Sequence, residues 1–339
     1  ALILPMLVFA SFTTACDKQT TSPVLSDDAV GMGASLPGSI TVVGTNTYPD
    51  DIQAVQDAVD NYSNITLEGV FNFGPYRGGG QVGITRDNVT LQGAEGATIT
   101  GGGRNSNPAS TVYGLNCVNL TVRNVTFDGS FEALGMYTYG TSTVNNVTTF
   151  EDNTIENSYY SIFAYQTNGT VNIVGNQCNQ VTDGPYAYRT AGAIRMVDNE
   201  CHQTSYGLLT YQCVSGFEGA SIEIKNNTMS GFLGIYSRYN RCPVTITENT
   251  VDAFAYGIAA FGWYHTQSFK DNGPVQIIEN SILMRESAYL RLGMMLGSSA
   301  AGLNNSLARN NTIEGLAGVG LARYPYGHDV IVTDNDLSN

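Results

Sequence analysis

Aromatic residues recur at matching positions along this chain, and their type and spacing suit carbohydrate binding. Where a glycine precedes an apolar residue, as at Gly207-Leu208 and Gly234-Ile235, the residues two and four places after the glycine face outward if the apolar residue faces inward. Carried through the chain, this register predicts the outward pairs Tyr137 and Tyr139, Phe163 and Tyr165, Tyr186 and Tyr188, Leu209 and Tyr211, Tyr236 and Arg238, and Ala259 and Phe261. A tyrosine offers a sugar a flat apolar ring and a hydrogen-bonding hydroxyl. The pattern predicts a strip under several sugar rings, or else rings that only stack on one another.

Catalysis on the same strip would depend on arginine and tyrosine. Glycoside hydrolysis uses two carboxylates, and the outward positions contain neither Asp nor Glu, so this reaction is not favoured. A polysaccharide lyase needs a base, together with a cation or calcium that neutralises a uronate carboxylate. Arg189, Arg238 and Tyr211 could serve, and His265 in the FGWYH segment is a fourth candidate. No metal-ligand spacing is present, so no cofactor is predicted, with calcium possible only for a lyase.

Composition restricts the class of protein. The 339 residues carry a formal net charge of −14, with only 13% charged residues, 38 glycines and 20 tyrosines. A chain this acidic would repel a phosphate backbone, so nucleic acid is not expected as a partner. The balance is typical of an all-β protein outside the cytoplasm, and we expect a monomer.

An asparagine repeat predicts the architecture that positions the aromatic residues. Nine copies follow short runs of alternating apolar residues, at Asn124, Asn153, Asn176, Asn199, Asn227, Asn249, Asn280, Asn311 and Asn335. A period near 23 residues indicates a repeat fold, with three short strands in each coil and coils stacked through parallel sheets. The expected fold is all-β, a parallel β-helix. We expect each asparagine to take the left-handed backbone conformation at a bend and to hydrogen-bond to its copy in the next coil.

The two ends of the repeat region differ. Residues Pro49 to Tyr62 read as a helix with Asp50 as N-cap, placed to cover the first coil at the open end of the sheets. The first coil strand is expected at Ile65 to Leu67, and DNDLSN stops partway through a coil. The β-helix is therefore assigned to residues 45–339 and is expected to be truncated at its C-terminus.

The first residues form an export signal rather than part of the fold. An apolar run ends in small residues and Cys16, and is too short to span a bilayer. This favours a lipoprotein signal, residues 1–16, with Cys16 lipid-modified and residues 17–44 as a flexible tether; the alternative is an ordinary secretory signal. The chain is expected in the bacterial cell envelope or outside the cell, touching a membrane only through the lipid anchor.

Five further cysteines allow alternative states. Cys178 and Cys201 each lie two residues after a repeat asparagine, so they should stack on neighbouring coils as a disulfide or as buried thiols. Cys213 and Cys242 form a second possible pair, and Cys117 is then left over.

The asparagine turns, the Gly-apolar strand and the preceding helix resemble the right-handed parallel β-helix superfamily, which includes pectate-lyase-like and NosD-like repeat proteins. The resemblance covers residues 45–339 and implies that the Gly-apolar strand lines the substrate groove. It does not select one function, because the superfamily is functionally diverse. Our leading hypothesis is a lipid-anchored protein that binds an extended polysaccharide along the aromatic strip. The alternatives are a lyase acting on an acidic glycan by β-elimination and a non-catalytic structural surface protein.

Overall fold

The computed structural model describes residues 38–105, 107–138, 147–213, 219–261, 273–286, 291–297, 305–315, 319–323 and 330–338. These residues belong to one compact unit, residues 36–339. Cys16 and the predicted signal segment lie outside the described residues, as do Tyr139 and His265. No helix in the described ranges is long and apolar enough to cross a membrane.

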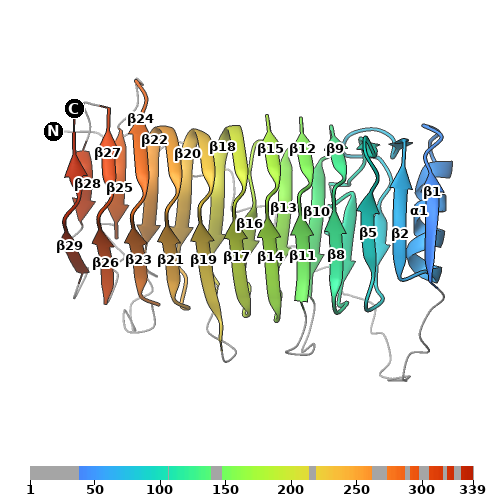
Figure 1. Cartoon of the computed structure of the whole chain (residues 1–339), viewed down its shortest axis with the longest axis horizontal. Coiled ribbons are helices and arrows are strands. Elements are labelled where there is room, and N and C mark those ends of the chain that lie inside the picture. Colours follow the sequence, from blue (N-terminus) through green and yellow to red (C-terminus); the bar gives the residue numbers. More distant parts are fainter. Residues whose placement is uncertain are drawn as a thin grey trace. The chain divides into compact units, whose positions relative to one another are not determined.

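Parallel strands stacked side by side form the protein, as Figure 1 shows. A first sheet of twelve strands contains the apolar runs that precede the repeat asparagines. Its strands, in spatial order, are β1 (Ser39–Val43), β2 (Asn64–Glu68), β5 (Thr90–Gly93), β8 (Leu120–Arg123), β11 (Val147–Glu151), β14 (Thr170–Val174), β17 (Ala193–Val197), β19 (Ser221–Lys225), β21 (Val244–Thr247), β23 (Val275–Ile278), β26 (Ser306–Arg309) and β29 (Val330–Thr333). Every coil therefore contributes one strand, which confirms the predicted parallel β-helix.

A second sheet of eighteen strands holds the other two strands of each coil. The strands that follow the asparagine position are β3 (Val70–Asn72), β6 (Thr98–Thr100), β9 (Thr126–Asp128), β12 (Thr154–Glu156), β15 (Gln177–Asn179), β24 (Ser281–Met284), β27 (Thr312–Glu314) and β30 (Asp336–Leu337). The strands on the aromatic side are β4 (Val82–Ile84), β7 (Val112–Leu115), β10 (Glu132–Tyr137), β13 (Tyr160–Tyr165), β16 (Tyr186–Tyr188), β25 (Leu292–Leu296) and β28 (Val319–Arg323).

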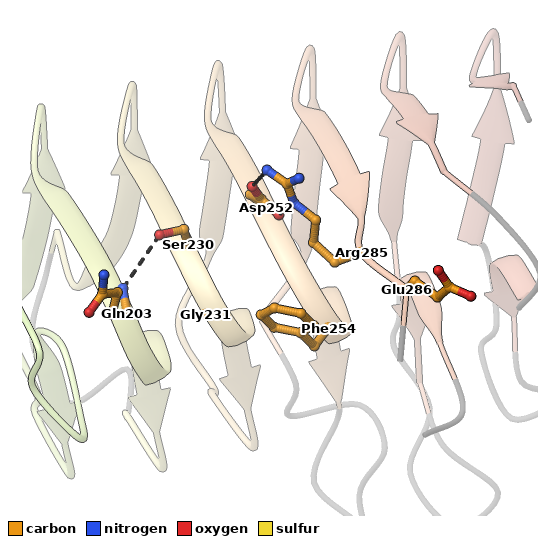
Figure 2. Close-up of a pocket in the computed structure, with 7 residues that line it drawn as sticks. All are labelled: Gln203, Ser230, Gly231, Asp252, Phe254, Arg285 and Glu286. Atoms are coloured by element: carbon orange, nitrogen blue, oxygen red, sulfur yellow. Dashed lines mark hydrogen bonds and ion pairs between the residues drawn. The ribbon is translucent and has the colours of Figure 1, made fainter. Parts of the chain in front are cut away.

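Three coils differ from the predicted three-strand pattern. In β18 (Glu200–Tyr211), β20 (Thr228–Arg238) and β22 (Thr250–Phe261), the second and third strands run together. The register between β18 and β20 shifts between Cys201 and Thr204, a bulge that bends the strand without ending it. These bends leave a shallow groove, shown in Figure 2, lined by Gln203, Ser230, Gly231, Asp252, Phe254, Arg285 and Glu286.

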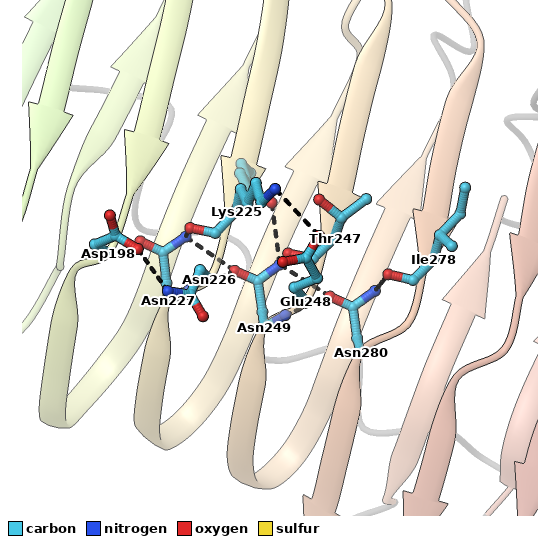
Figure 3. A network of polar contacts seen from close by, with 10 residues as sticks. Asp198, Lys225, Asn226, Asn227, Thr247, Glu248, Asn249, Ile278 and Asn280 are labelled. Carbon is cyan, nitrogen blue, oxygen red and sulfur yellow. Dashed lines mark hydrogen bonds and ion pairs between the residues drawn. The ribbon is translucent and has the colours of Figure 1, made fainter.

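The repeat asparagines form a continuous buried ladder, part of which is shown in Figure 3. Oδ1 of Asn249 accepts hydrogen bonds from both the backbone N–H and the Nδ2 of Asn227, each at 2.9 Å. Nδ2 of Asn249 donates to Oδ1 of Asn280 at 2.9 Å and to the Ile224 carbonyl at 3.0 Å. The same pattern links Asn153, Asn176, Asn199, Asn227, Asn249, Asn280, Asn311 and Asn335. The predicted ladder is confirmed, and it satisfies backbone groups at each bend that would otherwise be buried unpaired.

The prediction that these asparagines adopt the left-handed conformation is wrong. The positive φ falls on the residue before each of them, for example Asn226 (φ 53°) before Asn227 and Glu248 (φ 58°) before Asn249. Asn124 itself has φ 56° and is exposed, so it is not a ladder member. The Val125 N–H occupies the next ladder position and donates to Oδ1 of Asn153 at 3.2 Å. The inward position needs an amide because an amide both donates and accepts, whereas the left-handed position tolerates several residue types.

The N-terminal end begins earlier than predicted. Strand β1 precedes the helix and pairs with β2 in parallel register from Ser39↔Asn64, so the boundary at residue 45 is six residues too late and the end of the predicted tether belongs to the fold. Helix α1 (Asp50–Asn61) buries Val55 and Val59 and contacts β1, β3 and β4. Figure 1 shows this helix beside β1 at the end of the stack, as expected of a cap.

The predicted N-cap at Asp50 is also wrong. Pro49 occupies the cap position without a side-chain hydrogen bond. The next acidic residue, Asp51, is 2% exposed, and its carboxylate accepts hydrogen bonds from the backbone N–H groups of Thr45, Thr47 and Asn72. Asp51 therefore joins the helix to the first coils, which a helix-capping pattern could not reveal because these donors lie outside the helix.

The five described cysteines are buried free thiols. Cys178 pairs in register with Cys201 on neighbouring strands, as the repeat predicted. Of the alternatives left open by the sequence, the structure contains the thiol form.

Candidate functional site

The outward face of the aromatic strands carries two columns of side chains. The strands pair Phe163↔Tyr186↔Leu209↔Tyr236 in one column and Tyr165↔Tyr188↔Tyr211↔Arg238↔Phe261 in the other. Between them, the inward residues Ala164, Ala187 and Thr210 are 0% exposed. We call the partly exposed set Phe163, Tyr165, Tyr186, Tyr188, Tyr211, Tyr236, Arg238 and Phe261 the aromatic strip. The predicted register is correct for all of these residues.

Neighbouring rings of the strip contact one another along the coil axis. The ring centroids of Tyr165 and Tyr188 are 5.6 Å apart, and those of Tyr188 and Tyr211 are 5.3 Å apart with an interplanar angle of 23°. Tyr239, which follows Arg238 at a bend, extends the row with its centroid 5.5 Å from that of Tyr211. Stacking thus fixes the ring positions, and the partial exposure leaves ring surface that a ligand can contact.

Tyr137 does not belong to the strip, although the sequence predicted it there. It faces outward in register with Tyr165 but is fully buried. The prediction aligned Tyr137 with Phe163, whereas the structure pairs Tyr137 with Tyr165, so the first predicted pair was two residues out of register. The Tyr137 hydroxyl donates to Oε1 of Glu132 and lies 3.1 Å from Oγ of Ser110.

Glu132 is an outward carboxyl group that the sequence did not reveal. Its Oε1 accepts hydrogen bonds from the hydroxyl groups of Ser110 and Tyr137. This cluster lies over Gly135, the residue that pairs with Phe163 of the next coil. A Cβ atom at Gly135 would collide with Oγ of Ser110 and with the Tyr137 ring, so the missing side chain makes room for this cluster. Burial raises the pKa of Glu132 to about 7, although the two hydrogen bonds oppose that shift.

Asp183 is a second carboxyl group at the edge of the strip. It pairs with Tyr160 on one side and Tyr206 on the other, and Tyr160 in turn pairs with Glu132. Asp183 is 8% exposed, its Oδ1 has no hydrogen-bond partner among the described residues, and burial raises its pKa to about 7. The outward positions listed from the sequence contain no acidic residue, but these two carboxyl groups lie beside them. Both residues precede the positions counted from the Gly-apolar step, so that register could not find them.

Two arginines border the strip. The guanidinium carbon of Arg189 lies 4.9 Å from the Tyr188 ring centroid, and its Nε donates to Oε1 of Gln212 at 3.0 Å. The guanidinium carbon of Arg238 lies 5.0 Å from the ring centroid of Tyr211. Burial disfavours the charged form of Arg238, but Tyr236 and Tyr239 outweigh this and hold its pKa above the ordinary value. Arg238 is therefore a cation rather than a base. The candidates Arg189, Arg238 and Tyr211 all lie on or beside the strip.

No group of three or more potential metal ligands occurs among the described residues. The groove of Figure 2 shares no lining residue with the strip. Its floor holds Phe254, 43% exposed, next to an ion pair between Asp252 and Arg285. It offers one exposed ring, whereas the strip offers a row.

Comparisons with known proteins agree with this architecture. A family model described as "Right handed beta helix region" matches residues 110–282. No curated protein matches the sequence. The A-module of the mannuronan C-5 epimerase AlgE6 from Azotobacter vinelandii is similar in structure, with 14% identity, a TM-score of 0.45, and coverage of 87% of this chain and 96% of that one. PfbA, a surface adhesin of Streptococcus pneumoniae, has 13% identity, a TM-score of 0.37, and coverage of 85% and 87% respectively.

Proposed function

We propose that this chain, which belongs to the right-handed β-helix family, binds an extended polysaccharide along its aromatic strip. The observation that carries the proposal is the row Tyr165, Tyr188 and Tyr211, partly exposed and in register on successive strands. A row of tyrosines can stack under the apolar faces of sugar rings while hydroxyl groups meet the sugar hydroxyls. Contiguous exposed aromatic surface of this kind usually marks a binding site.

The regular spacing favours a polymer over a single sugar. Each ring lies 5.3 to 5.6 Å from the next, close to the spacing of the coils themselves. A ligand with several units along the coil axis gains one contact from each coil, and these contacts are held by a rigid scaffold. A monosaccharide would cover about one ring and gain little.

A binding experiment can separate the strip from the groove. We would measure binding of a polysaccharide panel by isothermal titration calorimetry to the wild type, Tyr188→Ala and Phe254→Ala. Phe254 is the matched control because it is an exposed ring on the same sheet but lies in the groove. Loss of binding in Tyr188→Ala alone supports the proposal. Loss only in Phe254→Ala would move the site to the groove, and no binding to any glycan would leave the tyrosines as a structural ladder.

β-Elimination on an acidic glycan is the second candidate function. The observation in its favour is the contact between Arg238 and Tyr211, which places a cation beside a phenol that could act as a base. Unsaturated products absorb near 235 nm, so incubation with uronate polysaccharides tests this directly. Product formation that is abolished in Tyr211→Phe would establish the lyase, and absence of product would leave the binding function.

We also propose that the protein is exported and held at the cell surface through Cys16. The support is the apolar run followed by small residues before Cys16 and a polar segment after it. Metabolic labelling with a fatty acid should mark the wild type and leave Cys16→Ser unlabelled. Equal labelling of the two proteins would contradict the anchor.

A further inference from the structure

Arg238 lies in an unusual environment within the aromatic strip. Its guanidinium carbon is 5.0, 5.6 and 4.4 Å from the ring centroids of Tyr211, Tyr236 and Tyr239. Its Nη2 donates a hydrogen bond of 2.9 Å to the Tyr239 hydroxyl. The three rings hold the guanidinium in place through cation–π contacts, and the residue stays partly exposed.

The charge of Arg238 has no counter-ion in the described part of the chain. The ion pairs found there involve Arg195, Lys225, His202 and Arg285 instead. The Nε of Arg238 is buried, and none of the residues that the structure describes accepts a hydrogen bond from it. Asp183 raises and Arg238 lowers the pKa of Tyr206, which lies near both. The raised pKa of Asp183 itself comes from burial, with no contribution from Arg238, so Asp183 is not the counter-ion of Arg238.

An unpaired, half-buried cation is costly and calls for an explanation. The rings recover part of the lost hydration and the Tyr239 hydroxyl accepts one hydrogen bond, but Nε has no acceptor among the described residues. A carboxylate is one group whose two oxygens match a pair of guanidinium N–H groups, and uronic acids carry it along a polysaccharide. The formal charge of −14 would repel an acidic polymer at long range, so attraction must come from local cations.

We infer that Arg238 binds a carboxylate group of the polysaccharide on the strip, so that the strip selects glycans containing uronic acids over neutral ones. The inference rests on the proposed glycan-binding function. Arg189 provides a second cation: it is exposed, lies against the Tyr188 ring and has no ion pair among the described residues. Tyr188 and Arg238 lie in one column, one coil to either side of Tyr211, so the two cations flank the same run of rings.

The test compares glycans that differ only in charge. Hexasaccharides of uronic acids, the same oligosaccharides with their carboxyl groups reduced to alcohols, and sulfated neutral hexasaccharides would be titrated into the whole protein. We expect the wild type to bind a uronate hexamer at least about tenfold more tightly than its reduced form, the effect of one charge-assisted hydrogen bond. Arg238→Gln should remove most of this difference. Arg238→Lys, which keeps the charge but not the fork, should retain an intermediate preference.

The outcomes separate the inference from the function on which it rests. Equal affinity of the wild type for charged and reduced glycans overturns the inference while leaving the binding function intact, and this comparison does not depend on any variant folding. Tighter binding of the sulfated glycan than of the uronate overturns the assignment to a carboxylate. If the preference for uronates is unchanged in Arg238→Gln and disappears in Arg189→Gln, the assignment to Arg238 is overturned and Arg189 binds the carboxylate instead. Failure of every glycan to bind overturns both proposals.

Discussion

The asparagine ladder allows one prediction to be worked out in full, at Asn249. This residue is 1% exposed and lies in the middle of the ladder. Replacing it with alanine removes the oxygen that accepts from the Asn227 backbone N–H and from the Asn227 Nδ2, both at 2.9 Å. It also removes donors to the Ile224 and Thr247 carbonyls. The site is buried, so these groups lose their partners without gaining bulk water.

The expected loss of stability follows from counting the lost hydrogen bonds. The two bonds from Asn227 and the two bonds to the Ile224 and Thr247 carbonyls contribute about 0.5–1.5 kcal/mol each, while Nδ2 of Asn227 keeps the Met196 and Lys225 carbonyls as acceptors. The free energy of unfolding of Asn249→Ala should therefore fall by about 2–6 kcal/mol, which is a large part of the stability of an ordinary domain. Urea unfolding followed by far-UV circular dichroism measures this change through the shift of the transition midpoint.

Two controls make the reasoning refutable. Asn335→Ala removes the same pattern of hydrogen bonds at a partly exposed position, where water can replace them, so it should cost about 1 kcal/mol. Asn124→Gly should be close to neutral, because Asn124 is exposed, is not in the ladder and has φ 56°. A loss below about 1 kcal/mol for Asn249→Ala, or one no larger than for Asn335→Ala, would refute the ladder as a source of stability.

Three further predictions concern the residues around the strip. Burial raises the native pKa of Asp183 from 3.8 to about 7. Between these pH values the native state therefore binds a proton that the unfolded state has lost. The free energy of unfolding of the wild type should fall as pH rises from 4 to 7, by up to about 4 kcal/mol from this group. Asp183→Asn should flatten this decline in urea titrations at several pH values, and an unchanged profile would contradict the assignment. Gly135→Ala should cost about 1–3 kcal/mol because its Cβ would collide with Ser110, whereas Gly129→Ala, with open space around it but φ 71°, should cost only its backbone strain of about 1–2 kcal/mol. Cys117 is fully buried and burial raises its pKa to about 12, so iodoacetamide should leave it unmodified in native protein and modify it in urea, as detected by mass spectrometry.

The fold could be predicted from the sequence because each coil repeats the same physical requirement. A buried strand needs alternating apolar residues, and the bend after it needs an inward amide, so Asn176 and Asn199 mark equivalent positions 23 residues apart. The same periodicity predicted the register of Tyr165, Tyr188 and Tyr211 correctly. It failed at Tyr137, because Gly135 pairs with the outward Phe163 and so does not mark the same step as the later glycines.

The buried carboxyl groups could not be predicted in this way. Glu132 and Asp183 lie before the strand positions that the repeat counts, and only the stacked coils bring them beside Tyr160. Their protonation depends on burial, which is a property of the assembled coils. Likewise, the lack of a counter-ion for Arg238 among the described residues is visible only once its neighbours in space are known.

A deletion of one complete coil tests whether the strip works as a repeat. Residues 177–199 run from the residue after one ladder asparagine, Asn176, through the next, Asn199. Their removal joins Asn176 to Glu200, just as Asn199 precedes Glu200 in the wild type. The ladder and the inward register are kept, and the shortened protein should fold, with β14 next to β19. The deletion removes Tyr186 and Tyr188, so Tyr165 would face Tyr211 directly. If binding energy accumulates coil by coil, affinity for a long glycan should fall by more than affinity for a disaccharide, because only the long ligand spans the missing coil. Equal losses for the two ligands would mean that one local pocket, rather than the row of rings, holds the glycan.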